Sequence, residues 1–524
     1  MGDHPLVRLS KAVSKPADVR RGLPSDFIRT SILCALALVP LTLRLNRESK
    51  LADGAPTGEN LSSRARVWQR SVACSLRTGT FLTVCDEAGG AHPIEEASPA
   101  DDRGHALLLT VWSMFSRRIP SPSDITRLNL AFNASALLLT GAAFWSSGLP
   151  LLAFLFVFLG AHFVIPGFRQ PDSAASFAGL YCLIVVAGIT LSSLLGEKPG
   201  GGRSFSLKYA LLLFWVGSIT LMRQPLGVCA VLFCSTLSAL AGRSVARGNA
   251  RARLRSAVLL LGPWLALCAP HALTASRDLL FAIPRSGIGI ATHGLGHALL
   301  LGLGEESNPF GIRWDDSYGE ALVGKERPGI TYLSAGYFRF AWRRYFGILL
   351  GSPIEVAKIY LRKTHTALHA MAMDGLGFFI VILWLAYFAA SHAVSPHASE
   401  IQSAFPCVLF GISATVVLSQ GIFGWPYPIY IYPSYMGFIF FKISLVLAAR
   451  ELRETPLAAC ALVWVLAGLS WGFLHPLQRV FGPDIYRLLE ASNLAAEMGL
   501  AVLSALFFLH RWNMRVATRP VASS

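Results

Sequence analysis

Long runs of apolar residues dominate this 524-residue chain and restrict what it can fold into. A transmembrane helix needs about 20 mostly apolar residues, because that length crosses the hydrocarbon core of a bilayer. About twelve segments meet this requirement. They are residues 28–45, 127–146, 149–166, 174–195, 206–222, 224–241, 256–273, 375–391, 403–420, 430–449, 456–474 and 494–511. We therefore expect an all-α polytopic membrane protein with about twelve transmembrane helices.

The composition agrees with this expectation. Hydrophobic residues make up 53% of the chain and charged residues only 15%, whereas soluble proteins carry about 25% charged residues. The net charge is +16, and the basic residues gather in short segments between apolar runs, such as residues 242–255. Cytoplasmic loops of membrane proteins carry such an excess of Lys and Arg. No basic domain with interleaved aromatic residues is present in the sequence, so we expect no nucleic-acid partner.

Orientation by the basic loops places both termini in the cytoplasm and two long segments outside, and the expected location is a bacterial inner membrane. Outer segments this long are usually either functional or disordered, and their helix-like stretches favour an ordered site. The expected organisation is a cytoplasmic segment (1–27), a first span (28–45), a first outer loop (46–126), spans two to seven (127–273), a second outer loop (274–374), spans eight to twelve (375–511) and a cytoplasmic tail (512–524).

The first outer loop contains an acidic pair, Asp101 and Asp102, directly before an apolar helical pattern at residues 104–115. This predicted helix is too short to span a bilayer, so we expect it to lie along the outer membrane surface. A carboxylate at that boundary can act as a general base on an acceptor hydroxyl. The alternative is that one aspartate simply caps the helix. Cys74 and Cys85 share this loop and can form a disulfide if the loop is extracytoplasmic.

This plan resembles that of the GT-C membrane glycosyltransferases. The stretch DDRGHALLLTVWSMF (101–115) is similar to the first-loop signature of that superfamily, in which an aspartate and a glycine or aromatic residue precede an amphipathic helix. His105 stands where an aromatic residue is often found, and we include it among the candidate substrate-binding residues. The resemblance implies that Asp101 or Asp102 is the catalytic base, as in protein mannosyltransferases and aminoarabinose transferases. It also implies a polyprenyl-phosphate-linked sugar as donor and a glycan, lipid or protein as acceptor.

Short outer loops supply further candidate binding residues. Arg169 and Asp172 lie between the third and fourth spans, and Arg223 lies between the fifth and sixth. An arginine at the membrane edge can bind a lipid phosphate or merely extend its side chain to the interface. Asp172 has the simpler alternative of capping the next helix.

The second outer loop contains two candidate groups. Asp315 and Asp316 lie near aromatic residues, a combination that is common in sugar-binding sites, although an ordinary polar loop is the alternative. Lys358, Arg362 and His365 recur at helical spacing just before the eighth span and continue to residue 369. Such a cationic stripe can bind the phosphate of a polyprenyl carrier, or it can anchor the helix at the interface.

We predict no metal site. His293 and His297 are four residues apart, but the glutamate of an HExxH motif is missing. A divalent cation held by the acidic loops remains an alternative. Two other functions also remain open: a transporter or flippase for a lipid-linked sugar, and a non-catalytic membrane assembly protein. The sequence shows no clear internal repeat, and its charged residues avoid the centres of the spans, which favours the enzyme over the transporter.

Overall fold

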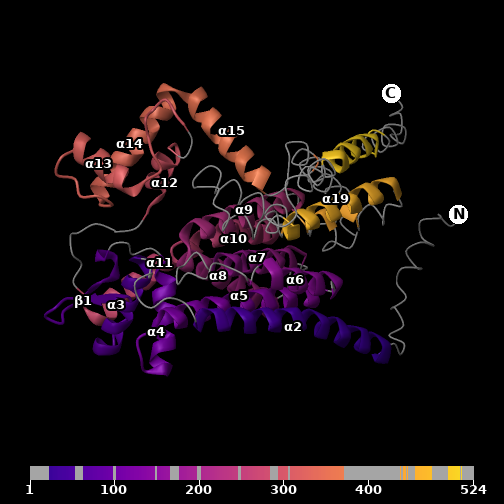
Figure 1. Cartoon of the computed structure of the whole chain (residues 1–524), viewed down its shortest axis with the longest axis horizontal. Coiled ribbons are helices and arrows are strands. Elements are labelled where there is room, and N and C mark those ends of the chain that lie inside the picture. Colours follow the sequence, from indigo (N-terminus) through magenta and orange to yellow (C-terminus); the bar gives the residue numbers. More distant parts are fainter. Residues whose placement is uncertain are drawn as a thin grey trace, which may run out of the picture.

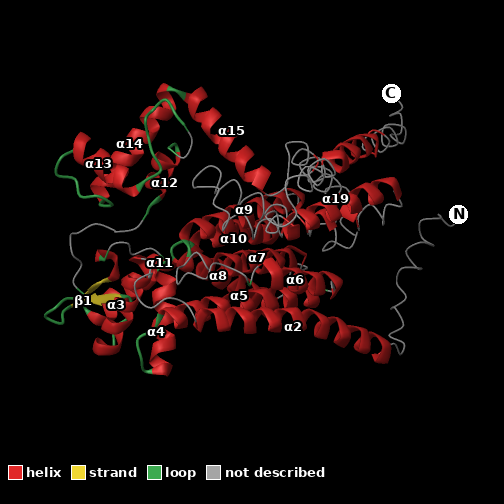
Figure 2. Ribbon diagram, in the orientation of Figure 1, coloured by secondary structure: helices red, strands yellow, loops and turns green. Residues whose placement is uncertain are grey.

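A computed structural model describes the chain over twelve main ranges and a few isolated residues. The ranges are 23–53, 63–97, 102–147, 150–163, 176–196, 202–245, 250–283, 293–304, 307–370, 441–446 except 444, 455–474 and 494–507. The described part is mostly helical, as predicted (Figure 2). It differs from the all-α expectation by one small two-stranded antiparallel sheet, β1–β2.

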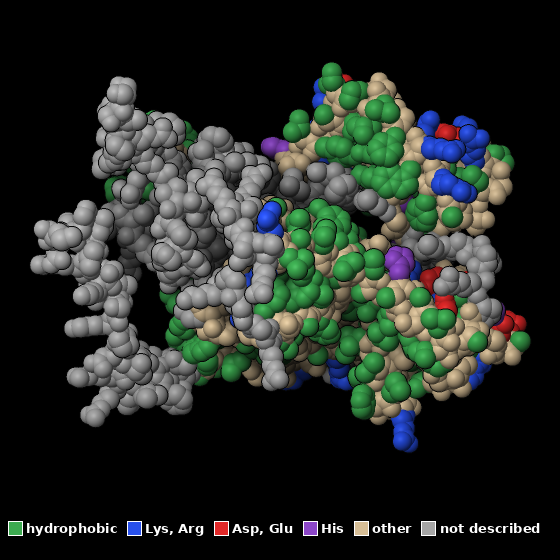
Figure 3. Space-filling model, turned by 180° about the vertical axis from the view of Figure 1, so that it is seen from behind, with side chains coloured by type: hydrophobic (Ala, Val, Ile, Leu, Met, Phe, Trp, Pro, Cys, Tyr) green, Lys and Arg blue, Asp and Glu red, His purple; other side chains and the backbone are tan. Residues whose placement is uncertain are grey.

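The main body is a bundle of apolar helices that lie side by side (Figure 1). Its helices are α2 (Leu23–Asp53), α5 (Pro122–Ser146), α6 (Pro150–Phe163), α7 (Phe177–Gly196), α8 (Gly202–Met222), α9 (Gln224–Val245) and α10 (Ala250–Ala266). Helix α7 is the most deeply buried of them and packs against α5, α8 and α9. The space-filling view shows hydrophobic side chains spread over the outside of this body (Figure 3).

Three described helices are long and apolar enough to cross a membrane: Pro122–Ser146, Phe177–Leu195 and Ser204–Met222. These agree with three of the predicted spans. Shorter apolar helices cover parts of others, at Pro150–Ala161, Gln224–Ala239 and Leu494–Phe507. Helix α19 (Thr455–Leu474) matches the predicted span 456–474. The predicted spans 375–391, 403–420 and 430–449 lie largely outside the described residues.

The predicted span 256–273 is two helices in the structure. Helix α10 ends at Ala266, α11 (Ala269–Phe281) begins after a short break, and the axes differ by 56°. A proline causes local disruption because it lacks an N–H and clashes with the preceding turn. Pro263 lies inside α10, and a second proline occupies the start of α11, where it is tolerated. The chain therefore turns out of the bundle sooner than the apolar run alone indicates.

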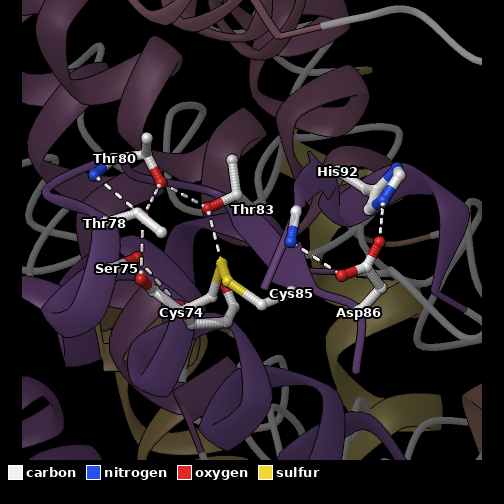
Figure 4. Close-up of a disulfide and its surroundings, with 10 residues drawn as sticks. Cys74, Ser75, Thr78, Thr80, Thr83, Cys85, Asp86 and His92 are labelled. Carbon is white, nitrogen blue, oxygen red and sulfur yellow. Dashed lines mark hydrogen bonds and ion pairs between the residues drawn. A yellow bond between two sulfur atoms is a disulfide. The ribbon is translucent and has the colours of Figure 1, made fainter. Parts of the chain in front are cut away.

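Two smaller units lie toward the same end of the bundle, at the left of Figure 1. The first contains α3 (Ser63–Thr78), β1 (Thr83–Cys85), β2 (Ala91–Pro93), a short 3-10 helix (Ile94–Glu96) and α4 (Arg103–Ser116). It has its own apolar core around Trp68 and Leu109. A disulfide between Cys74 and Cys85 joins the end of α3 to β1, as the sequence allowed (Figure 4).

The second unit contains α12 (Leu295–Gly302), α13 (Asp316–Glu326), α14 (Ala335–Gly351) and α15 (Pro353–Ala370). It also has a separate core, centred on Leu301, Tyr337 and Ile359. Side-chain caps mark the starts of α13 and α14, because Asp315 accepts a hydrogen bond from the Ser317 N–H, and Ser334 accepts one from the Tyr337 N–H. Small residues allow close packing here, since the ring of Trp342 leaves no room for a side chain at Gly296.

Candidate functional site

Asp102 lies at the junction between the first unit, which contains α3 and α4, and the bundle. It precedes α4 with φ 61° and ψ 47°, a left-handed conformation that Asp tolerates better than most residues. Its side chain makes no capping hydrogen bond to the helix and is only 3% exposed. The Asp102 carboxylate therefore does not cap α4, which was the simpler of the two roles that the sequence allowed. A sparsely populated backbone conformation of this kind is typical of functional sites.

The partner of this carboxylate is Arg223, which lies between α8 and α9. Its Nη1 donates to both Asp102 oxygens, at 3.2 Å each. The guanidinium carbon also lies 5.1 Å from the centre of the Phe177 ring. One guanidinium nitrogen therefore donates hydrogen bonds to the Asp102 carboxylate, while the Phe177 ring makes a cation–π contact with the guanidinium. Among the predicted binding residues that the structure describes, Arg223 is the one whose side chain contacts the carboxylate of the predicted base.

His105 occupies the next part of the same site. Its ring stacks on the buried Trp68 ring, with centroids 4.9 Å apart, and its Nε2 lies 2.8 Å from the Ser176 Oγ. It is 3% exposed, so its position is set by packing rather than by solvent. Close approach of α4 to the end of α8 brings these groups together. That approach requires Gly104, because a Cβ there would lie 2.9 Å from the Leu221 backbone.

A second ion-pair network lies beside Asp102 and was missed by sequence reasoning. Arg277 of α11 is 2% exposed, and its Nη1 lies 2.8 Å from Glu95 Oε2 and donates to the Leu82 carbonyl. Glu95 Oε1 also lies 3.2 Å from Arg103 Nη1. Buried charges are tolerated when they are paired and hydrogen-bonded. The network joins the first unit to α11. In the sequence, Arg277 appears only as a polar residue just after a predicted span.

Helix α4 exposes apolar side chains on the face that points away from the site. Val111, Met114 and Phe115 are 44%, 67% and 86% exposed, whereas Leu109 on the opposite face is buried. The helix therefore has one apolar side packed in the core of its unit and another apolar side that is exposed. A helix with such an outward face is suited to lying at a membrane surface. The helix predicted at residues 104–115 is thus present as α4, and its placement along a membrane surface stays a prediction.

Asp315 and Asp316 have different roles. Asp315 is the cap of α13, which is the ordinary loop alternative. Asp316 approaches two histidines: its Oδ2 lies 3.2 Å from His293 Nε2 and its Oδ1 lies 3.3 Å from His297 Nε2. These hydrogen bonds, that from His293 above all, lower the pKa of Asp316 well below its usual range. Sequence reasoning noticed the histidine pair but could not foresee the carboxylate that joins it.

The cationic stripe on α15 lies away from Asp102. Figure 1 shows α15 and α4 on opposite sides of the bundle. Lys358 Nζ lies 2.7 Å from Glu355, and Arg362 Nη2 lies 3.4 Å from the Ser307 carbonyl oxygen. His365 is exposed on the same helix. Lys358 and Arg362 line an open surface depression. Because α15 lies away from α4, the structure does not combine the three residues with the predicted base.

Three predicted site residues, Asp101, Arg169 and Asp172, lie outside the described residues. Comparison of the chain with protein-family models, curated proteins and solved structures produced no match.

Proposed function

We propose that the chain is a GT-C-type membrane glycosyltransferase that transfers a sugar from a polyprenyl-phosphate donor to an acceptor hydroxyl. The observation that carries this proposal is the Asp102–Arg223 pair. A buried carboxylate that does not cap its helix is held beside a guanidinium, next to a surface helix with an exposed apolar face. Transfer from a lipid-linked sugar phosphate needs a base for the acceptor proton, a cation for the departing phosphate and a position at the membrane edge for the lipid.

In the proposed reaction, the acceptor oxygen attacks the anomeric carbon of the sugar. The new carbon–oxygen bond forms as the bond from that carbon to the phosphate oxygen breaks, and polyprenyl phosphate leaves with the bonding electrons. Asp102 accepts the proton of the acceptor hydroxyl. Arg223 stabilises the charge on the departing phosphate, and charge-assisted hydrogen bonds to phosphate are among the strongest available. The donor phosphate would then replace Asp102 as the partner of Arg223, which would leave the carboxylate able to accept the proton.

The remaining parts of the proposal concern placement. We place the α3–α4 unit on the extracytoplasmic side of a bacterial inner membrane, with about twelve spans and both termini in the cytoplasm. The Cys74–Cys85 disulfide supports this side, because disulfides persist mainly in oxidising compartments. Lys358, Arg362 and His365 have no part in the transfer step, since α15 lies apart from α4.

The test uses the full chain reconstituted in lipid vesicles with a panel of radiolabelled hexose and pentose phosphopolyprenols. We expect the chain to consume at least one donor and to release polyprenyl phosphate. Asp102→Asn keeps the size and the left-handed tolerance of the residue, and it should lower turnover about 10²- to 10⁴-fold, the usual contribution of a general base. The matched control is Asp86→Asn, which removes an exposed carboxylate from the same unit and should leave turnover unchanged.

Two outcomes would reject the proposal. One is normal turnover in the Asp102→Asn chain. The other is movement of a donor across the vesicle membrane with no polyprenyl phosphate released, which would identify a transporter instead.

A further inference from the structure

We propose that His293, His297 and Asp316 form a zinc-binding site on the second outer unit. This inference is independent of the proposed glycosyltransferase, because the site lies among α12, α13 and α14 and shares no residue with the Asp102 region. The three residues come from two segments: the histidines lie at the start of α12, and the aspartate is the first residue of α13.

The distances suit a single small cation. The two His–Asp contacts are 3.2 and 3.3 Å, and all three possible ligand atoms lie within 4.8 Å of one another. Zinc binds His nitrogen at about 2.0–2.1 Å and carboxylate oxygen at about 2.0–2.2 Å, so tetrahedral ligands around it are about 3.3–3.5 Å apart. The two contacts involve different oxygens of the Asp316 carboxylate, so side-chain rotations would be needed to bring one oxygen and the two nitrogens to this spacing.

A buried tyrosine orients one of the histidines. Tyr337 Oη lies 2.8 Å from His297 Nδ1, and both side chains are buried, at 0% and 4% exposure. Metal-binding histidines usually have their second ring nitrogen fixed in this way, which directs the other nitrogen at the ion. Tyr332 Oη in turn donates to Asp316 Oδ1 at 3.2 Å. The two tyrosines thus hold the His297 ring and the Asp316 carboxylate in place.

The exposure of the three residues indicates where further ligands would bind. The Asp316 side chain is 61% exposed and that of His293 is 22% exposed, whereas His297 is buried. The ion would therefore have protein on one side and solvent on the other. Three protein ligands with an open position are typical of catalytic zinc sites, in which water or substrate is the fourth ligand. Two imidazoles favour zinc over magnesium or calcium, which prefer oxygen ligands.

The experiment measures zinc bound to the full chain, purified in detergent with a tag that contains no histidine. Isothermal titration with zinc alone is the main readout, and absorption of the cobalt-substituted chain reports the coordination geometry. We expect binding of a single equivalent of zinc to the parent chain. Asp316→Asn and His293→Gln should abolish that binding, and both positions are exposed enough for the fold to tolerate the change. Tyr337→Phe should weaken binding about 10- to 100-fold, the usual effect of losing a group that orients a ligand.

Two control variants separate a metal site from a general effect on the unit. Asp315→Asn changes the neighbouring capping carboxylate, and His271→Ala changes an exposed histidine on α11. Both should bind zinc as the parent chain does, and zinc should raise the melting temperature of these chains but not that of Asp316→Asn. The proposal is overturned if the parent chain binds no zinc, or if Asp316→Asn and His293→Gln bind it as tightly as the parent.

Discussion

Arg223 and Asp102 are 121 positions apart in the sequence, yet a single guanidinium nitrogen of Arg223 lies 3.2 Å from both oxygens of the Asp102 carboxylate. This contact links the α8–α9 junction of the bundle to the start of the surface helix α4. The arginine lies between two apolar helices, a position for which the sequence allowed either phosphate binding or simple interfacial placement. The carboxylate lies before a helix that it does not cap.

The Asp102–Arg223 pair should be strongly coupled energetically. Arg223→Gln leaves a carboxylate that is 3% exposed without its cation, and breaking a buried pair in this way costs about 3–5 kcal/mol. Asp102→Asn should cost less, because Arg223 is 18% exposed and retains contact with water. We expect the double variant to lose less stability than the sum of the two single variants. Melting temperatures of the four chains measure this coupling, and strictly additive effects would show that the pair contributes little.

Gly104→Ala should weaken the packing of α4 on α8. The added methyl group would lie 2.9 Å from the Leu221 backbone, which cannot move aside as a side chain would, so we expect a loss on the order of 1–3 kcal/mol. Gly324→Ala is the matched control, since a methyl group there meets nothing within 4 Å and lies inside the exposed helix α13. That control should gain about 0.5–1 kcal/mol. Equal melting temperatures for the two variants would contradict the close approach.

Removal of the Cys74–Cys85 disulfide should destabilise the unit that contains α3 and α4. Its cysteines are separated by 11 residues, and a loop of that length corresponds to about 3 kcal/mol of unfolded-state entropy. Replacement of both by Ser should therefore increase proteolysis within residues 63–97 and leave the bundle intact. Replacement of the exposed free Cys268 by Ser is the control and should have no effect on that unit. An unchanged cleavage pattern in the double variant would show that the unit does not depend on the bridge.

The hairpin beside the disulfide should be most stable at mildly acidic pH. Asp86 Oδ2 lies 2.9 Å from His92 Nε2 (Figure 4), and this hydrogen bond is the main cause that lowers the pKa of Asp86 and raises the pKa of His92. The carboxylate contribution is present above pH 3.8 and is lost as the pH falls through the lowered pKa. The imidazolium contribution is present below pH 6.5 and is lost as the pH rises through the raised pKa.

Hydrogen exchange of residues 83–93 can measure this pH dependence. The parent chain should be better protected than His92→Ala at about pH 5.5, and the two should converge at about pH 8.5. Comparison of the two chains at the same pH removes the intrinsic pH dependence of amide exchange. A difference that persists undiminished at the higher pH would show that His92 acts through packing rather than through its charge.

Much of the secondary structure could be predicted from local sequence. The pattern at residues 104–115 predicted α4, which extends from Arg103 to Ser116, and the stretch before the eighth predicted span is the helix α15. Apolar length, helical spacing and capping residues are properties of neighbouring positions, so they can be read without knowledge of the fold. The broken span at residues 256–273 shows the limit of this reading. Apolar content there was sufficient, but a proline at the start of α11 accompanies a 56° bend between the two helices.

The candidate sites depended on contacts that local patterns do not contain. The sequence by itself determined that the chain is rich in apolar helices and that its acidic residues fall in segments between them. Only the tertiary structure decided that Asp102 pairs with Arg223, that Asp316 joins His293 and His297, and that the α15 stripe lies elsewhere. The physical reason is that short-range propensity sets each helix separately, whereas packing of distant helices sets which side chains come within hydrogen-bonding distance.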